Sequence, residues 1–178
     1  MDSSQITEIV RNVIIQQKQD MSLELAKTLA KRVEERAAMM GVKAVVVIMN
    51  SGANPVLVHC MDDSFIASYD VAFNKAYTVV GLKISTIELK KLAQPGGSLY
   101  GIQNTNDGKI VIFGGGEPLM IGGRIVGGLG VSGGTEDEDT ALAAYGRQVF
   151  RPSVLDRLKA PPVHGAPEKP HKKEMEAR

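Results

Sequence analysis

The chain has 178 residues, of which 43% are hydrophobic and 4% aromatic, and its formal net charge at pH 7 is +1. This length predicts one domain with an aliphatic core, and the near-neutral charge argues against a general nucleic-acid-binding protein. The single cysteine, Cys60, excludes an internal disulfide and fits a reducing compartment. The sequence shows no apolar run of the roughly 20 residues that span a membrane and no secretory signal. We therefore expect a soluble, cytoplasmic protein that binds neither nucleic acid nor a membrane.

Residues 1–17 predict a short amphipathic helix that is separate from the main fold. Its apolar side chains recur at the spacing of one helix face: Ile6, Ile9, Val10, Val13 and Ile14. A helix of this length is marginally stable by itself, so it needs a surface on which to dock. The polar run at residues 16–20 separates it from the segment that follows.

Residues 21–150 contain the elements of one folded body. We expect helices at residues 22–41, 64–82 and 86–92, strands at 42–49, 56–61, 109–114, 118–121 and 124–132, and a last helix from Thr135. Gly122 and Gly123 are a two-residue hairpin signal between the last two strands. Because the strands come in hairpin-like groups, the order predicts an α+β fold with an antiparallel sheet of about five strands flanked by helices.

Residues 151–178 differ from the body in composition. They hold five of the eight prolines, no aromatic residue and many Lys and Glu. Such a segment cannot bury enough apolar area to order itself, so we expect it to be disordered. Its two histidines, His164 and His171, are then solvated.

The stretch at residues 113–135 holds ten of the nineteen glycines. A phosphate-binding loop leads into a helix with free N–H groups, but the glycines at 114–116 lead into a predicted strand. The helix after Gly134 begins with Thr135, which can form a capping box with Glu138, and four acidic residues there would repel an anion. The glycines inside the last strand therefore mark a bulge, or a place where another backbone, a subunit or a flat ligand comes close.

Several separated motifs together resemble one protein family. They are QPGGSLYG at residues 94–101, FGGGEPL at 113–119 and GGLGVSGGT at 127–135 with Asp139, together with the segments at residues 23–26 and 70–78. In this order they resemble the GlcG/HbpS/PduO C-terminal family over about residues 21–144. The resemblance implies a profilin-like fold, a three-layer α-β-α sandwich, and homo-oligomers. It also implies haem binding by some members and links of others to iron or to cobalamin metabolism.

The predicted helix at residues 2–17 resembles the encapsulation peptides of bacterial microcompartment cargo. Such a helix lays its apolar stripe in a groove of a shell or cargo partner. This interpretation places the protein inside a bacterial microcompartment of the cytoplasm. The alternative is that the helix packs on its own domain or on a sister subunit.

His59 is the leading candidate for a metal ligand, because it is the only histidine within the predicted body. His, Met and Cys side chains can all ligate haem iron. Strand alternation places His59 and Met61 on one face and Cys60 on the other. The alternative is that His59 is a surface or interface residue and Cys60 a small core residue.

Six further residues are candidates for a cofactor pocket: Lys75, Tyr77, Tyr100, Gly115, Gly116 and Gly128. Lys75 would bind a carboxylate or a haem propionate, unless it is a partly exposed lysine paired with a nearby acid, which is worth about 0.5 kcal/mol. The two tyrosines would stack on a flat ligand, or are ordinary packing residues. The three glycines would let the ligand approach the backbone.

These residues support three hypotheses. The first is an accessory protein that binds haem or a related tetrapyrrole, with cobalamin or iron as less favoured cofactors. The second is an enzyme that acts on a small anionic metabolite and uses Lys75 as its anchor. The third is a scaffold or adaptor that acts through its N-terminal helix. Because no Ser–His–Asp triad can be assembled from one body histidine, the sequence leans away from an enzyme.

Overall fold

The computed structural model describes residues 2–18 and 20–150, except for the side chains of residues 11–18. In chain order the elements are α1 (Ser3–Lys18), α2 (Leu23–Met39), β1 (Val45–Asn50), β2 (Pro55–Cys60), α3 (Ser68–Leu82), α4 (Thr86–Leu92), two short 3-10 turns (Ile102–Asn104 and Asn106–Gly108), β3 (Gly116–Ile121), β4 (Arg124–Ser132) and α5 (Glu136–Val149). The disorder expected for residues 151–178 lies outside the described residues.

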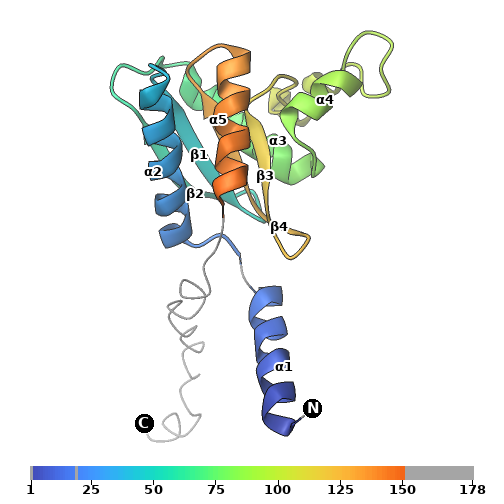
Figure 1. Cartoon of the computed structure of the whole chain (residues 1–178). Helices are drawn as coiled ribbons and strands as arrows, with labels where there is room; N and C mark the ends of the chain where they lie inside the picture. The colour runs from blue at the N-terminus through green and yellow to red at the C-terminus, as the bar shows by residue number, and fades with distance from the viewer. Residues whose placement is uncertain (1, 19, 151–178) are drawn as a thin grey trace, which may run out of the picture.

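The four strands form one antiparallel sheet in the order β2-β1-β4-β3. Strand β1 lies between β2 and β4, and five of its six residues are buried, which explains its continuous run of apolar side chains. Helices α2 and α5 lie side by side on one face, and α3 covers the other (Figure 1). The α+β fold and its three layers are confirmed, and the described residues contain four strands where about five were expected.

The strand expected at residues 109–114 is the one that does not form. Ile110 and Val111 are buried, as the pattern indicated, but side chains from other elements take the backbone donors of this segment and of the next residues. The N–H of Val111 donates to Thr78 Oγ1 at 3.0 Å, and the N–H of Gly114 donates to Glu136 Oε1 at 2.9 Å. The segment is therefore apolar because it is buried, as a strand would be. It does not form a strand, because no neighbouring strand among the described residues pairs with its backbone.

Local capping signals set the starts of several helices. Ser22 caps α2 by accepting from the N–H of Leu25, and Thr135 forms the expected capping box with Glu138 at the start of α5. Helix α3 begins at Ser68 and not at residue 64, because residues 62–63 and 66–67 form turns and Asp63 has a φ of 62°. Both helix α4 and strand β4 have the bounds expected from the sequence.

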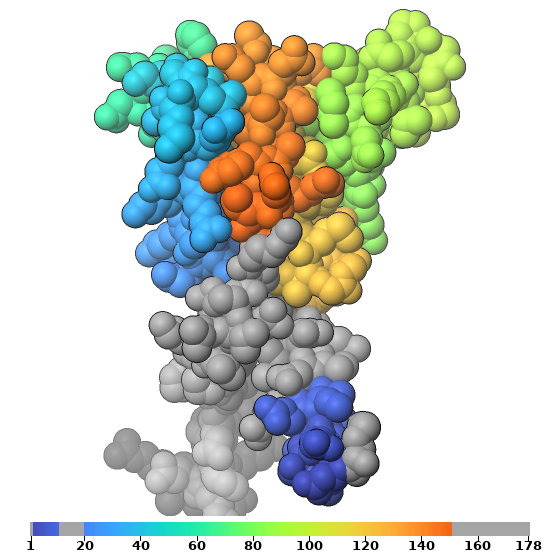
Figure 2. All heavy atoms as spheres, in the orientation of Figure 1, coloured from blue at the N-terminus to red at the C-terminus, as the bar shows by residue number. Residues whose placement is uncertain are grey.

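Helix α1 forms as expected and stands apart from α2 and α5 in Figure 1. The three apolar side chains that the structure describes in this helix are about half exposed, at 47% for Ile6, 50% for Ile9 and 49% for Val10. Figure 2 shows the atoms of α2 packed directly against those of α5. None of the described helices is both long and apolar enough to cross a membrane.

Candidate functional site

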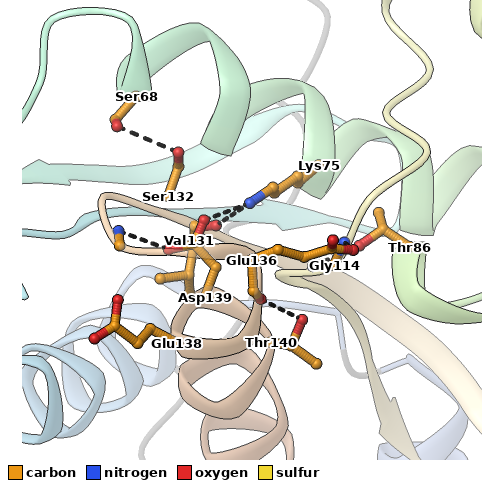
Figure 3. Close-up of polar contacts among 12 residues, drawn as sticks. Ser68, Lys75, Thr86, Gly114, Val131, Ser132, Glu136, Glu138, Asp139 and Thr140 are labelled. Carbon is orange, nitrogen blue, oxygen red and sulfur yellow. Dashed lines mark hydrogen bonds and ion pairs between the residues drawn. The ribbon is translucent and has the colours of Figure 1, made fainter. Parts of the chain in front are cut away.

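Lys75 on α3 lies in the interior and forms a buried ion pair. Its relative exposure is 0%, and its Nζ donates to Asp139 Oδ2 at 2.7 Å and to the carbonyl oxygen of Val131 at 2.8 Å. Figure 3 shows the side chain reaching from α3 toward Val131 of β4 and Asp139 in the first turn of α5. The ammonium is thus neutralised by a carboxylate of the same chain.

Asp139 joins this ion pair to the turn before α5. Its Oδ1 accepts from the N–H of Gly134 at 3.0 Å, while Oδ2 faces Lys75. Burial raises the pKa of Asp139 and lowers that of Lys75, although each partner favours the charged form of the other. The loss of hydration is therefore the larger effect at both groups, so the pair adds little net stability while fixing α3 against α5.

Residues 113–116 form a glycine-rich cover over the ion pair. The ring of Phe113 lies 4.9 Å from Lys75 Nζ, in cation–π geometry. Gly115 has a φ of 110°, and a Cβ at this position would lie 2.6 Å from Lys75 Nζ. Glu136 holds the cover by accepting from the N–H of Gly114 and from Lys90 Nζ, the latter at 2.6 Å. The role of Lys75 as an anchor for an anionic ligand stays a prediction, and it requires Phe113 to move.

Three other glycines of the stretch, Gly116, Gly128 and Gly130, let α3 pack closely against the sheet. A Cβ on Gly128 would lie 2.6 Å from the carbonyl oxygen of Ala76, and one on Gly130 would lie 2.0 Å from that of Ala72. Gly116 similarly faces Val79 and Thr86 at less than 3.0 Å. The close approach that the sequence left open is therefore made by the backbone of α3 along β4.

His59 lies on the edge strand β2, on the opposite face of the sheet from Lys75. Its Nδ1 is 2.6 Å from Glu34 Oε1 of α2, and 47% of its side chain is exposed. A carboxylate accepts, so Nδ1 is the donor in this contact, and in the neutral imidazole the lone pair for a ligand would then be on Nε2. The apolar cluster on the α2 side includes Leu57 and Met61, as the strand alternation predicted. Within the described residues, no group of three His, Cys, Asp or Glu side chains could hold a metal ion.

The two candidate tyrosines lie away from the ion pair. Tyr77 is half-buried, and its hydroxyl accepts from Asn106 Nδ2 at 3.3 Å. Tyr100 follows α4 and is 65% exposed. The structure thus brings Gly115 and Gly116 next to Lys75 and places Gly128 against Ala76 of the same helix. His59, Tyr77 and Tyr100 are not among the contacts of the ion pair.

Three acidic residues with buried or paired carboxylates were not among the candidate site residues expected from the sequence. Asp139 was visible only as part of the family-like motif, and Glu34 looked like any exposed residue of an amphipathic helix. Glu117 on β3 is 6% exposed, and its pKa is raised by burial although Arg147 Nη1 lies 3.4 Å from its Oε2. No local pattern distinguishes such acids, because their partners lie on elements distant in sequence.

Comparisons with known proteins agree with this architecture. The family model described as haem degrading protein HbpS-like matches residues 21–148. A Citrobacter freundii protein from the dhaT-dhaS intergenic region is 44% identical over 135 residues, which cover 76% of this chain and 95% of that protein. Corrinoid adenosyltransferase PduO of Salmonella typhimurium is 38% identical over 115 residues, which cover 65% of this chain but only 34% of PduO.

Solved structures show the same fold. Protein ORFY of Klebsiella pneumoniae has a TM-score of 0.72 and 39% identity, covering 74% of this chain and 91% of that one. A PduOC:haem complex has a TM-score of 0.70 and 35% identity, covering 73% and 94%. The resemblance seen in the glycine motifs thus extends over the folded body, and the chain belongs to the HbpS-like family.

Proposed function

We propose that the protein is an accessory binding protein for haem or a related tetrapyrrole, and that His59 is the iron ligand. The observation that carries this proposal is the pairing of His59 Nδ1 with Glu34 Oε1 at 2.6 Å in a side chain that is 47% exposed, so that the second ring nitrogen is not used by this contact. Haem-binding histidines are commonly oriented in this way by a hydrogen bond at their other nitrogen. The family membership and the fold shared with a PduOC:haem complex support it.

The surroundings of His59 fit one face of a tetrapyrrole. Half-buried Met61 lies on the same side of the sheet and would contact the ring, whereas Leu57 is buried in the core beside it. Lys31 lies one helical turn before Glu34 on α2 and is exposed, with its Nζ 4.0 Å from Glu35 Oε1, and it is our candidate partner for a propionate. When bound, the group would supply iron-centred redox chemistry, and the residues here would only hold and orient it.

Hemin titration tests this assignment. We expect the wild-type protein to shift and sharpen the Soret band at one equivalent of hemin, and His59→Ala to lose this change because the axial ligand is gone. A protein with both His164→Ala and His171→Ala is the matched control, since it removes the other two histidines and should bind as the wild type does. A Soret change that persists in His59→Ala would move the ligand elsewhere, and no change in the wild type would contradict haem binding.

We propose a second role for α1 as a docking helix for a microcompartment shell or cargo partner. The half-exposed side chains of Ile6, Ile9 and Val10 favour it, because they form an apolar face that is not buried in the body. Deleting residues 2–17 should abolish co-sedimentation with purified microcompartment shells and leave hemin binding unchanged. Replacing exposed Thr7 and Glu8 with alanine keeps the apolar face and is the control. Equal co-sedimentation of the deleted and full-length proteins would contradict this role.

A further inference from the structure

Helix α3 and the turn before it carry an exposed apolar stripe. Phe65 is 70% exposed, Ile66 95% and Tyr69 45%. The stripe continues along α3 with Phe73, whose ring stacks on that of Tyr69 with centroids 6.1 Å apart, and with half-buried Tyr77. Large apolar side chains that cluster in this way on a soluble protein usually mark an interaction surface.

The sheet beside this stripe is also incompletely covered. Helix α3 packs on β4, β1 and β3, whereas the edge strand β2 packs on β1 and α2. On the α3 side of β2, Val58 stays half-buried and Cys60 is exposed. The second apolar cluster, which includes Val47 and Phe73, therefore continues to the surface at this edge.

Charges of opposite sign lie on the two sides of Phe73 along the stripe. Asp70 is exposed between Tyr69 and Phe73, in the first turn of α3. Lys109 is exposed near the other end of the stripe, where its Nζ lies 5.9 Å from the ring centroid of Tyr77. Such a surface is complementary to itself when a twofold axis runs near Phe73, because each charge then meets the opposite charge of the other copy.

We propose that this stripe, Phe65–Ile66–Tyr69–Phe73–Tyr77, is the interface with a second copy of this chain. The two α3 helices run antiparallel across a twofold axis near Phe73. Phe65, Ile66 and Tyr69 of each copy cover the uncovered side of the other, and each Asp70 faces a Lys109. The antiparallel arrangement also places opposite ends of the two helix dipoles together. The family resemblance implies self-association without naming a surface, and this proposal supplies one.

Sedimentation velocity of the full chain over a range of concentrations tests the interface. We expect the wild type to form a dimer or a multiple of it, and Ile66→Asp to halve the particle mass or to weaken association on the order of 100-fold. Ile66 is 95% exposed, so the variant should fold normally, as circular dichroism will verify. Met39→Asp is the matched control, because Met39 is 79% exposed at the end of α2 and should leave the mass unchanged.

A charge exchange identifies the pairing. Asp70→Lys and Lys109→Glu should each weaken association, and the double variant should restore it because the opposite charges then meet again. A monomeric wild type, or an Ile66→Asp protein of unchanged mass, would overturn the proposal. If the wild type were monomeric, the stripe would instead bind α1 or another protein. Hemin titration of Ile66→Asp tests whether haem binding is independent of this interface. A variant that no longer dimerises but still changes the Soret band would support both proposals.

Discussion

Replacing Lys75 with methionine is expected to lower the free energy of unfolding by about 3–5 kcal/mol, because it leaves a buried carboxylate without its partner. Asp139 is 3% exposed, and after the change it would keep only backbone N–H donors. Urea denaturation followed by circular dichroism measures the loss. This loss in free energy of unfolding should become smaller as the pH is lowered. Burial raises the pKa of Asp139, so its carboxyl is then protonated more readily in the folded than in the unfolded state.

The double variant Lys75→Met with Asp139→Leu is the informative control. Removing both charges removes both costs of lost hydration, so its stability should return close to that of the wild type or exceed it. If Lys75→Met alone were as stable as the wild type, the ion pair would not be closed in solution, and the anionic-anchor role of Lys75 would gain support. If the double variant were the less stable one, the pair would contribute net stability, contrary to the pKa directions.

Gly130→Ala is expected to cost more than the usual 1–3 kcal/mol of an overpacked core, that is, more than about 3 kcal/mol. The new Cβ would lie 2.0 Å from the carbonyl oxygen of Ala72 and 2.7 Å from the nitrogen of Ala76. Both are backbone atoms of α3, so no rotamer change relieves the clash and the helix must move off the sheet. The same urea experiment measures the effect.

Gly81→Ala is the matched control on the same helix. No atom lies within 4 Å of the position of its Cβ, and Gly81 is exposed within α3. This change should be neutral or stabilise by up to about 1 kcal/mol through helix propensity. A Gly130→Ala protein as stable as Gly81→Ala would mean that α3 does not approach β4 as closely as the structure has it.

Much of the fold could be predicted because its signals are local. The capping residues Ser22 and Thr135, the hairpin glycines Gly122 and Gly123, and the period of the buried side chains each act within a few residues. The segment at residues 109–114 shows where such signals stop, because burial alone does not say whether a neighbouring strand is present. Its donors went to side chains of Thr78 and Glu136, which lie 33 and 22 positions away in the sequence.

The candidate site depended on the tertiary structure to a greater degree. The sequence by itself determined the α+β class and the family motifs, and it named Lys75, His59 and the glycines as candidates. Only the tertiary structure decided that α3 is the element that approaches those glycines, that Asp139 neutralises Lys75, and that His59 lies on the opposite face beside Glu34. The physical reason is that helix propensity, capping and strand alternation are set by neighbours in the chain. Ion pairing and burial depend instead on which distant elements the folded sheet and its helices bring within a few ångströms of one another.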